Sequence, residues 1–72
     1  MLQKKLGRRI SELRHLQKLT QEQLAEALGC SVEFISLVER GVNAPSVGSL
    51  TGYAKILKVE VKDLFTFDGK KR

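Results

Sequence analysis

One segment near the middle of the chain carries the signals for two short helices joined by a single glycine turn. Thr20 and Gln23 form a capping box, in which each side chain can bond the other residue's backbone N–H in the first turn of a helix. Gly29 can take the left-handed conformation that ends this helix without a Cβ clash. Ser31 can cap a second helix, and Gly41 can end it. A helix, a tight turn and another helix predict a helix-turn-helix.

The second helix of this pair, about residues 32–40, has two different faces. Ile35 and Val38 lie together on its inner side. The outer arc combines polar, charged and apolar side chains: Val32, Glu33, Ser36, Leu37 and Arg40. A mixed surface of this kind is typical of a helix that reads another molecule, whereas a solvated helix more often carries Lys and Glu ladders. For so short a helix, simple exposure to solvent remains an open alternative.

The ordered residues of this segment resemble the Cro/repressor-type (XRE-like) family of helix-turn-helix DNA-binding domains. The matching elements are Thr20-Gln21-Glu22, Leu24-Ala25, Gly29, Ser31, Ile35-Ser36, Glu39-Arg40-Gly41, Leu57-Lys58-Val59 and Leu64-Phe65. The resemblance covers about residues 6 to 66. It implies an all-α, compact five-helix lambda-repressor-like domain, in which helices 2 and 3 form the helix-turn-helix and helix 3 enters the DNA major groove.

The chain before this segment is predicted to form a first helix from residue 2 to about residue 18. Its apolar stripe recurs at steps of four and three: Leu2, Leu6, Ile10, Leu13 and Leu16 or Leu19. Basic side chains lie away from the stripe, where a solvated cationic face is the simplest interpretation: Lys4, Lys5, Arg8, Arg9 and Lys18.

Two further helices are expected after the helix-turn-helix. A fourth helix is predicted at about 47–57, and a last short helix from residue 61 to about residue 67. Leu64 and Phe65 are expected to close the core. The sequence thus predicts one helix-turn-helix domain over residues 1–67, followed by a basic tail, 68–72, that we expect to be disordered.

The charge of the chain is unevenly distributed. The 72 residues carry a formal net charge of +5, which suits a polyanionic partner. Residues 1–20 contain six basic residues and one acidic residue, a balance of +5, whereas residues 21–41 contain one basic and four acidic residues, a balance of −3. Attraction to phosphate is therefore expected from the first helix, the tail, helix N-termini and neutral hydrogen-bond donors.

Four outer residues of the third helix are the candidate base readers. Glu33 can accept a hydrogen bond from cytosine N4, and Val32 and Leu37 can contact thymine methyl groups. Ser36 can bond several bases and therefore discriminates weakly.

Four other residues are candidate phosphate ligands. The family resemblance implies this role for Gln21 at the start of the second helix, where a plain first-turn residue is the alternative. Arg40 is placed for a phosphate at the end of the third helix, and Asn43 and Ser46 in the following loop are further candidates. Contacts of this kind set register rather than sequence preference.

The resemblance also implies a structural ion pair between Arg14 and Glu39, which would connect the first helix to the end of the third. The only histidine, His15, lacks neighbours at ligand spacing, so we expect a surface residue, and no metal or cofactor site is predicted. Cys30 is expected to pack against the core, with a redox-sensing thiol as the alternative.

The sequence therefore predicts a sequence-specific DNA-binding transcriptional regulator, expected to be a repressor, that binds a palindromic operator in double-stranded DNA. The alternative is a protein-interaction module, such as an antitoxin or assembly factor. An enzyme is rejected because neither a nucleophile–base pair nor a metal cluster is present. We expect a cytoplasmic protein of bacterial or phage origin with no membrane association, since no apolar run approaches about 18 residues.

A single small domain presents one short helix to DNA, so a homodimer with two such helices is expected. Apolar and aromatic residues of the C-terminal half are the candidates for its interface: Tyr53, Val59, Val61 and Phe67.

Overall fold

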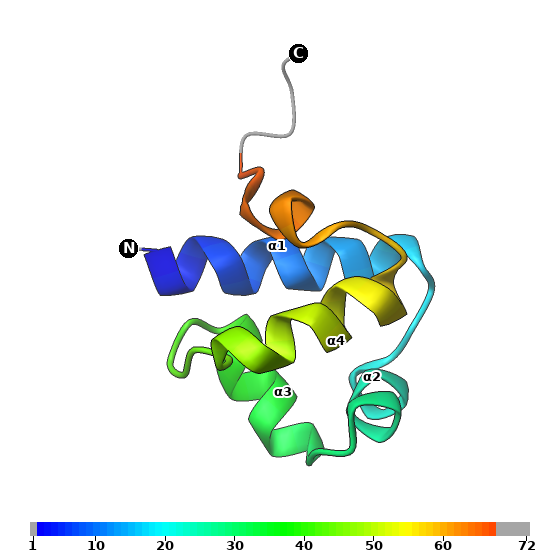
Figure 1. Ribbon diagram of the computed structural model, residues 1–72. Helices are drawn as coiled ribbons and strands as arrows, with labels where there is room; N and C mark the ends of the chain where they lie inside the picture. The colour runs from blue at the N-terminus through cyan, green and yellow to red at the C-terminus, as the bar shows by residue number, and fades with distance from the viewer. Residues whose placement is uncertain (1, 68–72) are drawn as a thin grey trace.

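The computed structural model describes residues 2–67, and the basic tail predicted at 68–72 lies outside the described residues. Four α-helices and one 3₁₀-helix follow one another: α1 (Leu2–Leu16), α2 (Gln21–Leu28), α3 (Val32–Glu39), α4 (Val47–Leu57) and η1 (Val61–Phe65). No strand occurs within the part of the chain that the structure describes. The predicted all-α class and the helix-turn-helix, α2 and α3, are confirmed (Figure 1).

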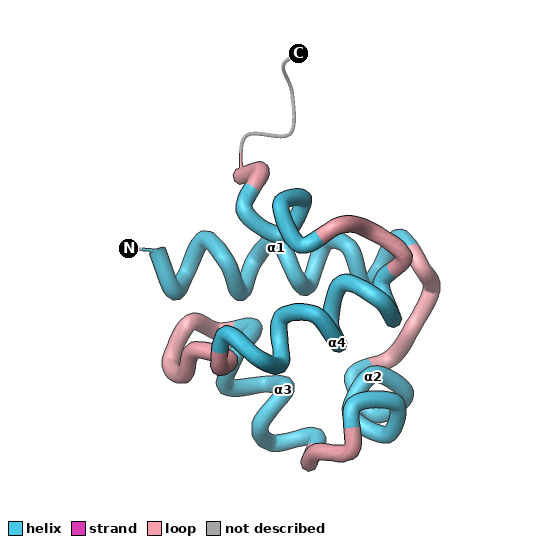
Figure 2. Tube along the Cα trace, in the orientation of Figure 1, coloured by secondary structure: helices cyan, strands magenta, loops and turns pink. Residues whose placement is uncertain are grey.

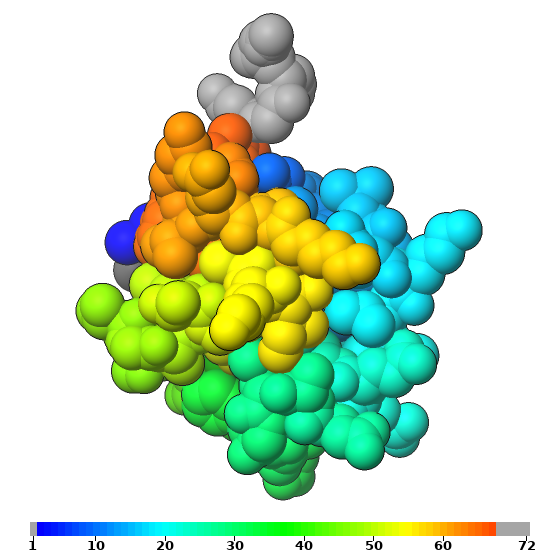
Figure 3. Space-filling model, turned by 45° about the vertical axis from the view of Figure 1, so that its right-hand side comes forward, coloured from blue at the N-terminus to red at the C-terminus, as the bar shows by residue number. Residues whose placement is uncertain are grey.

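The helices pack around one central layer of apolar side chains. α1 contacts α3, α4 and η1, whereas α2 packs against α3 and α4. Short loops connect the elements (Figure 2), and α4 and η1 lie side by side on one face of the molecule (Figure 3). The helix-turn-helix is therefore held from behind by α1 and α4, and η1 covers the other side of the same two helices.

The last helical segment is shorter than the sequence predicts. It is a 3₁₀-helix of five residues that ends at Phe65, whereas the predicted helix reached about residue 67. The Asp63 carboxylate accepts the Glu60 N–H at 2.9 Å, and the Thr66 N–H turns back to the Asp63 carbonyl. Capping at both ends of so short a segment favours the tighter helix, which proteins use in short pieces.

The core combines residues from every helix. Its buried apolar members are Leu6, Ile10, Leu13, Leu24, Ala25, Ile35, Val38, Leu50, Tyr53, Ala54, Leu57 and Leu64. Leu64 closes the core as predicted, but Phe65 points outward with 39% of its surface exposed. Leu2 and Leu16 of the predicted stripe are also exposed, because they lie at the two ends of α1, beyond the neighbouring helices.

Tyr53 corrects the predicted dimer interface. Only 1% of its surface is exposed, so it belongs to the core and cannot contact a second copy. Its hydroxyl group has no hydrogen-bond partner. Burial, followed by the nearby Cys30 and Glu39, raises the pKa of Tyr53 to about 12, and the side chain therefore stays neutral at ordinary pH.

Arg9 also departs from its predicted place on a solvated face. Its Nε donates a hydrogen bond to the Asp63 carbonyl oxygen at 2.9 Å, and its guanidinium lies 3.6 Å from the Glu12 carboxylate. Arg9 thus connects η1 to α1 and satisfies a carbonyl group of the short helix.

α1 and α3 approach each other closely at Gly7. A Cβ added there would clash with the Val38 carbonyl oxygen and would lie 2.8 Å from the Glu39 carbonyl oxygen. The glycine therefore lets α1 lie directly against the last turn of α3. By contrast, a Cβ added at Gly48 in α4 would meet no atom within 4 Å.

We predict opposite effects of Gly→Ala at these two helical positions. Gly7→Ala should lower the free energy of unfolding by about 1–3 kcal/mol, because backbone atoms must move to admit the methyl group. Gly48→Ala should raise it by up to about 1 kcal/mol through helix propensity. Urea denaturation of both variants measures the difference, and equal stabilisation by both changes would contradict the close contact at Gly7.

Candidate nucleic-acid interface

The local signals predicted for the helix-turn-helix are present in the structure. The Gln23 N–H donates to Thr20 Oγ1 at 3.0 Å, and the Thr20 N–H donates to Gln23 Oε1 at 2.8 Å, which completes the capping box. Gly29 ends α2 with φ 74°, in the left-handed region. Ser31 Oγ then accepts the Phe34 N–H at 3.1 Å and caps α3. These contacts fix the angle between the two helices locally.

The outer arc of α3 is left uncovered by the rest of the fold. Ile35 and Val38 are buried, whereas the candidate base readers are exposed or half-buried on the other side: Val32, Glu33, Ser36 and Leu37. Val32 leaves 39% of its surface exposed at the start of the helix. The structure therefore places all four candidates on one accessible face.

A single carboxylate connects three elements behind this face. Arg14 in α1 donates from Nε to Glu39 Oε2 at 2.7 Å and from Nη2 to Glu39 Oε1 at 3.1 Å. Gln21 in α2 donates from Nε2 to Glu39 Oε1 at 3.0 Å. The two charged side chains are only 9% and 7% exposed. The ion pair suggested by the family resemblance is thus part of a larger network.

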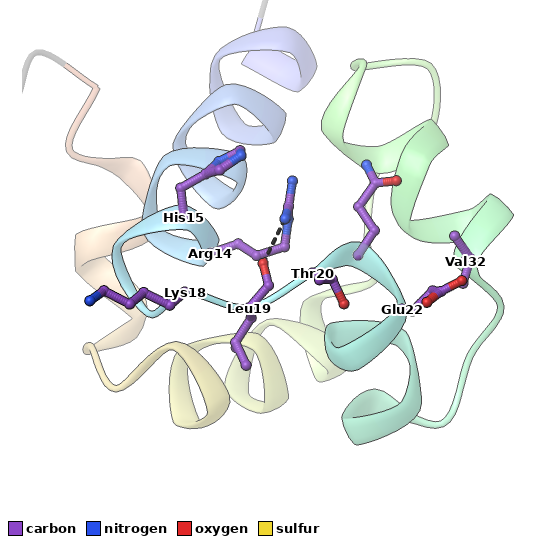
Figure 4. Close-up of a pocket in the computed structure, with 8 residues that line it drawn as sticks. Arg14, His15, Lys18, Leu19, Thr20, Glu22 and Val32 are labelled. Carbon is purple, nitrogen blue, oxygen red and sulfur yellow. Dashed lines mark hydrogen bonds between the residues drawn. The ribbon is translucent and has the colours of Figure 1, made fainter.

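Arg14 makes one more contact that extends this network to the loop before α2. Its Nη1 donates to the Leu19 carbonyl oxygen at 2.7 Å, the bond drawn in Figure 4. The guanidinium group therefore bonds both the end of α3 and the residue that precedes the Thr20 cap. Sequence patterns within one helix contain no sign of the contact to Leu19 or of the bond between Gln21 and Glu39.

Gln21 is held in a defined orientation at the N-terminus of α2. One N–H of its amide group bonds Glu39, and the amide carries a second N–H. The first-turn N–H groups of a helix also point outward and attract anions. The geometry thus suits the predicted phosphate contact.

A concavity of about 640 Å³ opens beside this N-terminus (Figure 4). Its wall includes three basic side chains from the end of α1 and the loop that follows: Arg14, His15 and Lys18. His15 Nδ1 lies 2.7 Å from the Ser11 carbonyl oxygen, so the imidazole ring is held against its own helix. His15 and Lys18, which were not predicted from the sequence as phosphate ligands, lie in this wall just before the second helix.

The three candidates after α3 differ in their surroundings. Arg40 is exposed, and the Asn43 N–H bonds the Leu37 carbonyl at 3.2 Å, which keeps the loop against the end of α3. Ser46 instead caps α4, since its Oγ accepts the Ser49 N–H at 3.2 Å. Arg40 and Asn43 therefore lie near the outer face of α3, whereas the Ser46 hydroxyl is already engaged.

Between residues 2 and 67, no group of three or more His, Cys, Asp or Glu side chains could hold a metal ion. The helices of this range are also too short or too polar to cross a membrane. Cys30 is half-buried and packs against the core, as predicted.

Comparison with known proteins gives consistent results. The helix-turn-helix family HTH_3 matches residues 10–64. The uncharacterized HTH-type transcriptional regulator YazB of Bacillus subtilis is 40% identical over 58 residues, which cover 81% of this chain and 84% of YazB. The restriction-modification controller protein C.AhdI of Aeromonas hydrophila is 35% identical, with a TM-score of 0.81 over 86% of this chain and 94% of that protein.

A further solved structure shows a similar domain together with DNA. It is that of SinR, a master regulator for biofilm formation, in complex with DNA. SinR is 30% identical to this chain, with a TM-score of 0.76 over 82% of this chain and 95% of the SinR chain.

The buried network predicts a strong effect at Glu39. Glu39→Ala should reduce the free energy of unfolding by about 3–5 kcal/mol, because it leaves the Arg14 guanidinium buried without its partner. The exposed Glu26 in α2 is the matched control, and Glu26→Ala should change stability by less than about 0.5 kcal/mol. Thermal and urea denaturation compare the two, and similar small effects at both positions would show that the ion pair is not structurally important.

Proposed function

Because this chain belongs to the helix-turn-helix family HTH_3, we propose that it is a sequence-specific DNA-binding transcriptional regulator that places α3 in the major groove. The observation that carries the proposal is the Glu39 network, which fixes the N-terminus of α2 and the outer face of α3 relative to each other. A rigid pair consisting of an anion site and a reading helix suits a duplex, in which phosphates and base edges have a fixed spacing.

The dimensions of α3 fit this role. Eight residues form a helix about 12 Å long, and the major groove is about 12 Å wide. Glu33 would accept a hydrogen bond from cytosine N4, and Val32 and Leu37 would contact thymine methyl groups. Ser36 lies between them and would bond more than one base. Sequence preference would therefore rest on few strong contacts.

Phosphate contacts would come from both ends of this surface. Gln21 and the first turn of α2 form one group, with Lys18 beside them. Arg40 and Asn43 form the second group, at the other end of α3. Ser46 is a weaker candidate because its hydroxyl already caps α4. The two groups would bracket the base-reading residues and set their register.

The charge balance fits a regulator that depends on correct docking. Residues 21–41 carry four acidic residues and one basic residue, and although Glu39 is paired with Arg14, the exposed Glu22, Glu26 and Glu33 leave the reading unit with an acidic surface that DNA repels. Favourable binding would therefore require that the neutral hydrogen-bond donors and the helix N-termini bind phosphate groups of the DNA backbone in one defined register. We therefore expect a modest nonspecific affinity.

A homodimer would supply the second reading helix. Val61 and Phe65 on η1 are exposed by 38% and 39%, and the Phe65 ring packs edge-on against Phe67 with 6.2 Å between ring centroids. Val59, two residues before Val61 in the sequence, is half-buried and packs against the core. This apolar surface lies outside the helix-turn-helix, so pairing through it would leave α3 free. Tyr53 has no part in it.

We propose that the protein is a repressor that binds a palindromic operator. We further propose that it acts in the cytoplasm and is not an enzyme. The protein-interaction alternative, an antitoxin or assembly factor, is not favoured. Similar proteins are named as transcriptional regulators, and one related domain is seen in complex with DNA.

A variant of a base-reading residue and a variant of a phosphate ligand should affect DNA binding differently. Glu33→Gln should change the motif recovered by selection from random DNA, at a cost of about 1–3 kcal/mol on the original site. Arg40→Ala should weaken binding to all sequences alike and reduce the salt slope of log K by about one unit. Lys5→Ala, on the side of α1 away from Gly7 and α3, is the control and should leave the motif unchanged. An unaltered motif in Glu33→Gln would remove Glu33 from the base readers.

The dimer proposal predicts an inverted repeat in the selected DNA. Its half-site centres should lie about 10–10.5 base pairs apart, one helical turn. Phe65→Asp should shift the protein toward the monomer in sedimentation equilibrium and weaken binding to the full site much more than to one half-site. A wild-type monomer at high concentration, together with a single non-palindromic site, would contradict the proposed pairing.

A further inference from the structure

α1 carries a row of basic side chains beside its contact with α3, and we call this row the basic stripe: Lys4, Arg8 and His15. All three residues are exposed, and they lie about 60–100° around the helix from Gly7, the residue that touches the end of α3. Leu6 and Ile10 lie on the opposite side of Gly7 and are buried in the core. The basic stripe therefore borders the contact between α1 and α3 on its solvent side.

The two ends of the basic stripe adjoin the two proposed groups of phosphate ligands. A Cβ added at Gly41 would lie 2.7 Å from the Lys4 Cα atom, so the first turn of α1 packs against the residue that follows Arg40. At the other end, His15 lines the concavity beside the N-terminus of α2, which also includes Gln21 (Figure 4). The basic stripe thus runs along α1 from one group to the other.

The charges of the basic stripe differ from the other arginine charges of α1. Arg9 and Arg14 are engaged with groups of the fold itself, as described above. Within residues 2–67, by contrast, neither Lys4 nor Arg8 forms an ion pair with an acidic side chain. Both charges are therefore available to an anion outside the protein.

The neighbouring helix-turn-helix lacks such charge. Glu22 and Glu33 are exposed there, and Arg40 is the single basic residue of the segment 21–41. Lys4 and Arg8 would add two positive charges beside this acidic surface. A polyanion that follows both α3 and α1 would therefore be attracted along α1, which offsets the repulsion from the helix-turn-helix.

The length of the basic stripe suits a polymer of phosphates. Lys4 and His15 are 11 residues apart, which corresponds to about 17 Å along α1. The phosphates of one DNA strand follow one another every ~3.4 Å of the duplex axis, so a strand that passes along α1 presents several of them.

We propose that the basic stripe binds the sugar–phosphate backbone of double-stranded DNA beside the groove that α3 reads, with Lys4 and Arg8 as its charged phosphate ligands. This role, which rests on the proposed function, extends the DNA-binding surface from the helix-turn-helix to α1. Phosphate contacts are independent of base sequence, so Lys4 and Arg8 would strengthen binding without changing the preferred motif.

Two double variants with the same net charge test this role. Lys4→Gln/Arg8→Gln removes the two charges of the basic stripe, whereas Lys5→Gln/Lys55→Gln removes two exposed charges, one from the other side of α1 and one from α4. Each change lowers the formal net charge by two from +5. Glutamine matches lysine and arginine in helix propensity, and melting curves check that both variants are folded. DNA affinity is then measured over a range of salt concentrations, on the operator selected by the wild type and on a duplex of random sequence.

Lys4→Gln/Arg8→Gln should make the slope of log K against log salt less steep by about 1.8 on both duplexes, about 0.9 for each lost phosphate contact. The control should change the slope by less than half as much, and both variants should select the wild-type motif. An unchanged slope in Lys4→Gln/Arg8→Gln would overturn the proposal. Equal changes in the two variants would also overturn it, because net charge alone would then explain the effect.

Failure of the proposed function would give a different result. If the wild type bound duplex DNA but selected no motif, α3 would not read bases, and the slopes on the random duplex would still decide the role of the basic stripe. If the wild type did not bind duplex DNA at all, both proposals would be wrong.

Discussion

The arrangement of this protein depends on the buried carboxylate of Glu39. It accepts hydrogen bonds from Arg14 and from Gln21, which belong to two different helices, and its own helix is the one proposed to read DNA. Two charges with less than a tenth of their side-chain surface exposed are favourable only as a bonded pair. The ion pair therefore contributes mainly to the conformational specificity of the fold. It selects one relative placement of α1, α2 and α3, and the apolar core then stabilises that placement.

The close contact at Gly7 makes that pairing geometrically possible. Gly7 and Arg14 are seven residues apart, about two helical turns, and so lie on the same side of α1. Because Gly7 has no side chain, α1 packs directly against the carbonyl groups of Val38 and Glu39. At this separation the Arg14 side chain reaches the Glu39 carboxylate. Arg14 also bonds Leu19, which holds the loop that leads into α2. Packing and electrostatics thus support the same placement.

Local signals made much of the fold predictable from the sequence, and contacts between distant residues account for what was missed. The Thr20 cap, the Gly29 turn and the bounds of α4 depend on neighbouring residues alone. Phe65 and Tyr53 were misplaced because the side that a short segment buries depends on which helix packs against it. The positions of the candidate DNA contacts followed from helix periodicity, whereas the bond between Gln21 and Glu39 joins residues 18 apart and required the structure.

If Glu39 orients Gln21 toward a phosphate, the contribution of Gln21 to DNA affinity must depend on Glu39, and a double-mutant cycle measures that dependence. The background Arg14→Met/Glu39→Leu replaces the ion pair with apolar side chains, a change that proteins often tolerate, and its melting curve checks that it is folded. Gln21→Ala is then measured in the wild type and in this background, against the same selected operator. Gln21→Ala should clearly weaken binding in the wild type, and in the background the loss of binding free energy should be less than half as large. Equal losses in both would show that Gln21 binds DNA independently of Glu39, and the proposed role of Glu39 would then be wrong.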